Sequence, residues 1–156
     1  MPKLQGFISY THEDAAMCKS LRDHLAVADT SDHIEFWTDK AISAGRYWND
    51  EIEKAIQNAK VFLMLISARF DASTYIRDKE RPAIEKRVKY CNGLIVPVVL
   101  YPCVLPKGLS DRQAVPITDK GHLRPIAKWR LRDEGFTAAH IQLRNALDTW
   151  CRKWRP

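Results

Sequence analysis

The chain has 156 residues, 46% of them hydrophobic and 28% charged, which is typical of one globular domain with its own core and excludes a disordered or fibrous protein. Its longest apolar runs, residues 61–66 and 94–100, are far too short to cross a bilayer, and no signal-peptide core follows Met1. From these two features we expect a cytoplasmic protein without membrane contact. The net charge of +6 comes from Lys and Arg scattered along the chain, so we expect no nucleic-acid contact.

The residue types that build metal and nucleophile sites do not gather in known motifs. The four cysteines are widely spaced without a Cys-x-x-Cys pair, and the five histidines show no ligand spacing. No serine lies in a nucleophile-elbow motif, and the sequence has no Gly-rich phosphate loop. We therefore expect neither a metal nor a bound cofactor.

Short apolar runs alternate with amphipathic segments, which indicates βαβ units and a parallel sheet. Residues 7–10 are predicted as the first strand. Thr11 precedes Asp14 by three residues, the spacing of a capping box, and a helix is expected over residues 13–27. Residues 34–38 are predicted as the second strand, followed by a loop over residues 39–46.

The next helix is predicted from its apolar stripe. Trp48, Ile52, Ile56 and Ala59 recur at helical spacing, which favours Trp48 as a core anchor, with stacking on a ligand as the alternative. Residues 61–66 are apolar without alternation, as in a central strand covered on both faces.

Prolines shape the predictions for the second half. Pro82 is comfortable only in the first turn of a helix, so a helix should start near Glu80 or Arg81. Residues 94–99 are predicted as the fourth strand, with Pro97 indicating an edge or a bulge. Residues 101–125 contain four prolines and no sustained period, although residues 114–117 are a candidate fifth strand. An apolar face over residues 136–150 predicts the final helix.

The polar residues that follow the predicted strands point to one functional edge. Ser9, Tyr10, Asp39 and Ser67 each lie at or just after the carboxyl end of a strand. In open parallel sheets, ligands bind outside these carboxyl ends. We therefore expect the chemistry of the protein at this edge.

Several motifs in register resemble those of Toll/interleukin-1 receptor (TIR) domains of the bacterial NAD-cleaving type. In chain order they are Phe7-Ile8-Ser9-Tyr10 with Glu13-Asp14, Trp37-x-Asp39-x-x-Ile42-x-x-Gly45-x-x-Trp48, Ile52-x-x-Ala55-Ile56-x-x-Ala59, Ile66-Ser67, Ser73-x-Tyr75 and Glu80-x-Pro82. A series of this length is far more specific than any single motif.

The resemblance implies an α/β, flavodoxin-like TIR fold with about five parallel strands and helices on both faces. It implies one TIR domain over residues 1–156, expected as the N-terminal effector part of a longer protein. The implied partners are NAD⁺, other TIR domains in homotypic assembly and an attached sensor domain. The implied function is hydrolysis of the nicotinamide–ribose bond to give nicotinamide and ADP-ribose or a cyclic form, in an immune or antiphage effector activated by assembly.

The resemblance places the catalytic carboxylate at Glu80. Nicotinamide departs neutral from a pyridinium, so the reaction needs no general acid and one carboxylate suffices to stabilise the ribosyl cation. An anion about 4 Å from that cation is worth on the order of 4 kcal/mol at an effective dielectric near 20. We expect the helix N-terminus to favour the ionised form of Glu80. The alternative is a glutamate chosen only for the first turn of a helix.

The resemblance also implies a set of substrate-binding residues. The loop between the second strand and the second long helix would shape the NAD⁺ pocket and contact neighbouring domains, and its alternative is a simple connector. Departures from the family pattern are Tyr75, where some relatives have tryptophan, and Ile76 in place of a cysteine. The predicted substrate-binding residues are Tyr10, Asp39, Ile42, Ser43, Gly45, Trp48, Ser73 and Tyr75.

Two other functions compete with NAD⁺ cleavage. The first is a TIR–TIR signalling or scaffolding module without enzymatic activity, against which the presence of Glu80 argues. The second is a flavodoxin-like phosphorylation receiver, but the first strand ends in Ser9 and Tyr10 instead of paired acidic residues.

Overall fold

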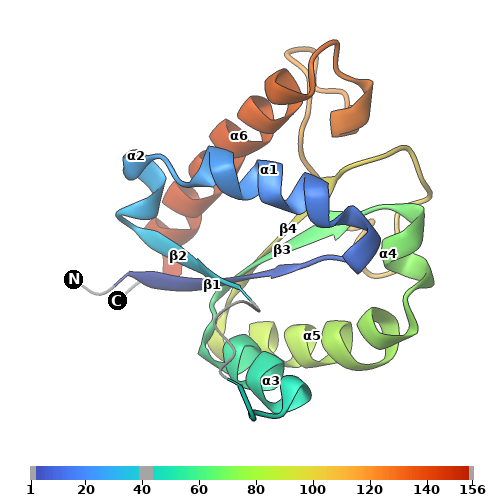
Figure 1. Cartoon of the computed structure of the whole chain (residues 1–156). Helices are drawn as coiled ribbons and strands as arrows, with labels where there is room; N and C mark the ends of the chain where they lie inside the picture. The colour runs from blue at the N-terminus through green and yellow to red at the C-terminus, as the bar shows by residue number, and fades with distance from the viewer. Residues whose placement is uncertain (1–2, 39–43, 155–156) are drawn as a thin grey trace.

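The computed structural model describes residues 3–38 and 44–154, in which a parallel sheet is covered by helices on both faces (Figure 1). The four strands of this sheet lie in the order β2-β1-β3-β4. Their bounds are Leu4–Ser9 for β1, Ile34–Trp37 for β2, Val61–Ile66 for β3 and Leu94–Val99 for β4. This is a flavodoxin-like order, as predicted, and it places a topological switch point between β1 and β3.

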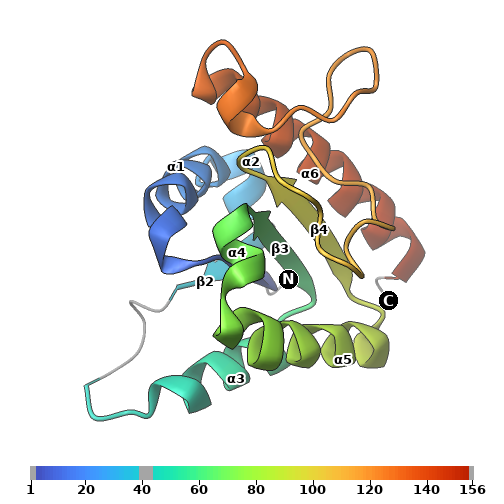
Figure 2. The ribbon, with the colours of Figure 1, turned by 90° about the vertical axis from the view of Figure 1, so that its right-hand side faces the viewer.

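The helices divide between the two faces of the sheet (Figure 2). One face is covered by α1 (Ala15–Leu25) and α6 (Arg132–Trp154), with the short α2 (Ala28–Ser31) beside them. The other face is covered by α3 (Trp48–Asn58), α4 (Ala68–Ala72) and α5 (Arg81–Cys91). Short helical turns are η1 (His12–Asp14), η3 (Ile76–Glu80, a π-helical turn) and η4 (Ile126–Lys128). None of the helices among the described residues has both the length and the apolar character needed to cross a membrane.

The central strand β3 joins the two halves of the core. All six of its residues are buried, with Leu63 and Leu65 in the cluster under α1 and α6. Phe62, Met64 and Ile66 lie in the cluster under α3 and α5. Since side chains alternate between the faces of a strand, a strand covered on both sides must be apolar throughout. The uniform apolar pattern of residues 61–66 is thereby confirmed as a central strand.

The predicted fifth strand is reduced to one residue, and the sheet in the described part of the chain has four strands. Val115 forms an isolated parallel bridge with Val98, donating to the Pro97 carbonyl and accepting from the Val99 amide at 2.9 Å each. The next backbone groups facing the same way, those of Ile117, bond instead to the Gln142 side chain of α6. The ladder therefore ends after one bridge.

Pro97 lies where the strand tolerates it. The amides of Leu94 and Leu100 donate to carbonyls on the side of β3. Successive amides of a strand point to alternate sides, so position 97, three residues from each leucine, faces away from β3. β4 is the edge strand of the sheet, and a missing donor on that side removes no bond to β3. The edge position predicted from Pro97 is confirmed.

The predicted capping box at the start of the first helix is wrong. The Thr11 hydroxyl donates to the Glu13 carboxylate, and Thr11 makes no side-chain cap bond to the helix backbone. Asp14 is turned to the interior, where it binds Ser67 and Arg69. A pairing with residues 53 and 55 positions away outcompetes the local cap, and a 3₁₀ turn precedes α1.

Candidate active site

An open cleft of about 300 Å³ lies at the carboxyl end of β1, where the order of the strands reverses. Its floor includes Phe7 and Trp37, whose rings stack with centroids 5.7 Å apart and planes at 12°. The predicted site residues that line it are Tyr10, Trp48, Ser73, Tyr75 and Glu80. The functional edge expected from the sequence thus carries a cleft, at the position where doubly wound folds bind ligands.

The remaining predicted binding residues are Asp39, Ile42, Ser43 and Gly45. Asp39, Ile42 and Ser43 lie outside the described residues. Gly45 has a φ of 84°, a left-handed conformation that favours glycine, and it lines a separate hollow with Arg46 and Tyr47 beside α3.

Glu80 is the acidic side chain buried against the cleft. It ends the π-helical turn η3, directly before α5, and its side chain comes within reach of the end of β1. The residue is 7% exposed, and the Ser9 hydroxyl donates to Oε1 at 2.5 Å. Burial raises the pKa of Glu80 to about 7, and the hydrogen bond from Ser9 opposes that rise.

The expectation that a helix N-terminus keeps Glu80 ionised is therefore corrected. The helix does begin at Arg81, as predicted, but η3 precedes it without a break. The Arg81 amide already bonds to the Ile76 carbonyl, so it is not left as an unpaired donor for a carboxylate. Desolvation is the dominant influence, and it favours the neutral acid.

Two aromatic side chains form a wall beside Glu80. The rings of Trp48 and Tyr75 lie with centroids 4.9 Å apart and planes tilted by 40°. Trp48 is 50% exposed and lines the cleft, so its assignment as a core anchor is wrong. The alternative, stacking on a ligand, stays a prediction. The buried stripe of α3 consists of Ile52, Ala55 and Ile56, and Trp48 lies one turn earlier, at the start of the helix.

Ser73 and Tyr75 take part in the local structure that carries Glu80. Ser73 precedes η3, and its hydroxyl and carbonyl accept from the amides of Ile76 and Arg77 at 3.4 and 3.0 Å. Burial raises the pKa of the Tyr75 phenol, and the negative charge of Glu80 adds to that rise. Both residues line the cleft, so Ser73 combines the local role with a place in its wall.

Several cleft residues escaped the sequence-based prediction. His12 and Glu13 line the cleft from the turn after β1, and the hydrogen bond from Thr11 lowers the pKa of Glu13. Arg22 of α1 lines it as well and donates to the Trp37 carbonyl at 2.7 Å, holding the end of β2. The sequence does contain a sign of this position for Arg22. It lies four residues after Cys18, on the face of α1 that points to the core.

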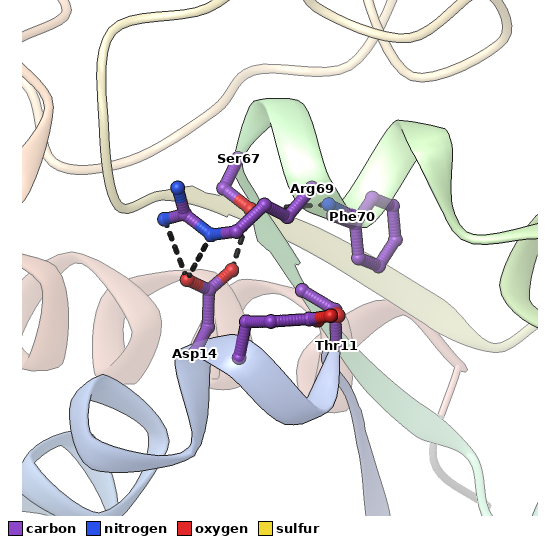
Figure 3. Close-up of polar contacts among 6 residues, drawn as sticks. Thr11, Asp14, Ser67, Arg69 and Phe70 are labelled. Atoms are coloured by element: carbon purple, nitrogen blue, oxygen red, sulfur yellow. Dashed lines mark hydrogen bonds and ion pairs between the residues drawn. The ribbon is translucent and has the colours of Figure 1, made fainter.

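A second buried carboxylate, that of Asp14, forms a polar cluster that does not line the cleft (Figure 3). Asp14 is 2% exposed and accepts from Ser67 at 2.5 Å and from the Arg69 guanidinium at 2.8 and 3.1 Å. The Ser67 hydroxyl also accepts from the Phe70 amide, capping α4. Arg69 lies over the Tyr101 ring, 4.9 Å from its centroid. This cluster ties the start of α1 to the start of α4.

The flavodoxin-like sheet, the cleft at its switch point and the ordered motifs around it define a TIR domain. The chain belongs to this family, because a family model described as TIR domain matches residues 7–128. The chain is 30% identical over 141 residues to the uncharacterized protein y4lF of Sinorhizobium fredii, covering 90% of this chain. It spans only 42% of the length of that relative.

Solved structures show the same fold. The TIR domains of the activated Roq1 resistosome, which directly recognizes the pathogen effector XopQ, align with a TM-score of 0.53 and 22% identity. That alignment covers 63% of this chain and 58% of the Roq1 chain. The TIR domain of the Toll-related receptor TRR-2 from Hydra magnipapillata aligns with a TM-score of 0.51 and 19% identity, over 74% of this chain and 85% of that one.

Proposed function

We propose that this TIR domain is an NAD⁺ hydrolase that cleaves the nicotinamide–ribose bond, with Glu80 as the catalytic carboxylate. The observation that carries the proposal is a buried glutamate at the wall of a cleft, beside two aromatic rings. Aromatic walls suit a planar pyridinium, and a carboxylate suits a developing ribosyl cation. A module that only recruits other TIR domains has no use for a buried acid in a cleft.

The pKa of Glu80 fits the chemistry of hydrolysis. The bond between C1′ and the pyridinium nitrogen breaks with its electron pair going to nicotinamide, which leaves neutral. Water then bonds to C1′, and its proton passes to Glu80 and on to solvent, giving ADP-ribose. In the cyclic form, a nitrogen of the adenine would take the place of water. A carboxyl with a pKa of about 7 is present in both forms at neutral pH, as a general base requires.

The size of the cleft supports a proposal for which part of NAD⁺ it holds. About 300 Å³ is at the lower end of ligand pockets, which suits the nicotinamide and its ribose better than a whole dinucleotide. The diphosphate would then lie outside this space, and Arg22 and His12, which also line the cleft, are candidates to contact it.

Mass spectrometry after incubation with NAD⁺ tests the proposal directly. Glu80→Gln removes the charge and keeps the volume, so release of nicotinamide should fall by about a thousandfold. The matched control is Glu85→Gln on α5, which follows η3 directly. Glu85 is a half-exposed glutamate that pairs with Arg112 at 3.5 Å, and this variant should retain full activity. Near-normal turnover of Glu80→Gln would exclude Glu80 as the catalytic group, and an inactive wild type would favour the scaffolding function.

We further propose that homotypic assembly raises the activity, with an attached sensor domain as the natural trigger. Gly45 in its left-handed conformation and the 79% exposed Tyr47 lead from the loop into α3, beside the cleft. Head-to-tail contacts through this region would extend into open assemblies and order the site. Specific activity should therefore rise with protein concentration, and Gly45→Pro should flatten the profile because proline is restricted to negative φ. A flat profile from a fully active monomer contradicts this.

A further inference from the structure

The hydrogen bond between Ser9 and Glu80 joins two side chains that are 71 positions apart. Ser9 is the last residue of β1 and is completely buried. Its hydroxyl donates to Oε1 of Glu80 at 2.5 Å. Within the described residues, the Glu80 side chain accepts this hydrogen bond from Ser9 and forms no ion pair with a cation. The orientation of the carboxylate therefore depends on one hydroxyl.

Asp14 shows what the same fold does with a carboxylate that has a structural role. Ser67 follows β3 as Ser9 ends β1, and its hydroxyl also donates to a buried carboxylate at 2.5 Å. Asp14 receives two further bonds from Arg69, which neutralise its charge. Glu80 has the serine without the cation, so one carboxylate oxygen is held and the other remains for a ligand in the cleft.

We propose that Ser9 is a positioning residue for NAD⁺ cleavage: it fixes Oε1 of Glu80, so that Oε2 meets the ribose. The proposal rests on the proposed function of the cleft. Ser9 is not a catalytic residue, because a side chain with no exposed surface touches no ligand. Its effect passes entirely through Glu80.

The bond also sets the charge state of the carboxyl. Burial raises the pKa of Glu80 and the Ser9 hydroxyl lowers it, so loss of the hydroxyl should shift the pKa further upward. A smaller fraction of Glu80 would then be ionised at neutral pH. The charged or titratable groups that face Glu80 are His12, Glu13 and Arg22 across the cleft, Tyr75 beside it, and Glu53 and Lys79 along the groove between α3 and α5. None of these is altered by a change at Ser9.

Ser9→Ala and Ser67→Ala form a matched pair for the test. Each removes one buried hydroxyl that bonds a carboxylate at 2.5 Å. For Ser9→Ala we expect kcat at pH 7 to fall about tenfold with KM within twofold, since a hydrogen bond to a charged group is lost. The acid limb of the kcat profile should move to higher pH, and the deficit should shrink at pH 9. Ser67→Ala should lose stability and keep the wild-type pH profile.

Titration of the Glu80 carboxyl by ¹³C NMR separates this proposal from the function itself. In Ser9→Ala the midpoint should move to higher pH whether or not NAD⁺ is the substrate, and Ser9→Cys, with its weaker donor, should fall in between. If the wild type cleaves no NAD⁺ while the midpoint shifts, the proposed function fails and the control of the carboxyl by Ser9 stands. An unchanged midpoint and kcat profile in both Ser9→Ala and Ser9→Cys would overturn the proposal.

Discussion

Glu80 and Asp14 are two buried carboxylates at one edge of the same sheet, yet their surroundings give them opposite roles. Each accepts a hydrogen bond of 2.5 Å from a serine at the end of a strand. Asp14 also faces the Arg69 guanidinium and does not line the cleft. Glu80 has no such cation among the described residues and lies against the cleft. The fold supplies Asp14 with all of these partners, whereas under the proposed function the second partner of Glu80 is the substrate.

Asp14 and Glu80 should also differ in how their charges affect the stability of the fold. A carboxylate removed from water needs an opposite charge and hydrogen bonds to repay its desolvation. Asp14 receives both from Ser67 and Arg69. Glu80 receives one neutral donor, and its pKa of about 7 measures how strongly burial resists the charge. A carboxyl whose desolvation is not compensated by an opposite charge is more typical of a functional site than of a structural one.

The largest loss of stability should come from Asp14→Asn. The neutral amide forms no ion pair with Arg69, and its NH₂ group meets either the Ser67 hydroxyl or the Arg69 guanidinium. The free energy of unfolding should therefore fall by about 2 to 3 kcal/mol. This is below the range for fully buried pairs because Arg69 is 46% exposed. Urea denaturation measures it. Asp78→Asn, at an exposed ion pair with Arg77, is the control and should change the free energy by less than about 0.5 kcal/mol.

The corresponding change of Glu80 to its amide should raise the free energy of unfolding instead of lowering it. Between pH 4.5, the ordinary pKa, and about 7, the folded state keeps a proton that the unfolded state has lost. Wild-type stability therefore falls as pH rises through this window. Glu80→Gln removes this cost and should gain about 3 kcal/mol at pH 8, with no gain at pH 4. Urea titrations at the two pH values measure it, and a loss of stability at pH 8 would contradict the assignment.

The sequence was informative where a pattern is local to one element. Residues 61–66 and 94–99 are strands with the predicted bounds, because burial on both faces demands continuous apolar residues. The fifth strand was not predictable to this accuracy. Its ladder ends because Gln142, 25 residues away, takes the backbone groups of Ile117. Competition between distant partners leaves no mark on a local pattern.

The site divides in the same way. Glu80, Tyr10, Ser73 and Tyr75 were predicted from the resemblance to TIR domains, and all four line the cleft. Spacing also put Trp48 on the apolar stripe of α3, but the stripe does not tell which turn of a helix extends beyond the core. The role of Ser9 was out of reach, since its bond to Glu80 spans 71 positions and exists only after the sheet forms.

The smallest effect should come from Trp48→Ala, which changes the cleft beside Glu80 and leaves Asp14 untouched. Trp48 is half exposed and packs on Tyr75, so its removal should cost less than about 1 kcal/mol of stability. The lost stacking surface should raise KM for NAD⁺ about fivefold, since an aromatic contact is worth about 1 kcal/mol. Tyr90→Ala, an 84% exposed aromatic at the far end of α5, is the control for losing a ring. If both variants bind NAD⁺ as the wild type does, the aromatic wall is not a binding surface, and Glu80 alone distinguishes this edge of the sheet. If KM rises in Trp48→Ala only, the aromatic wall of the cleft binds NAD⁺, and access to this cleft distinguishes the proposed catalytic carboxylate, Glu80, from the structural carboxylate, Asp14.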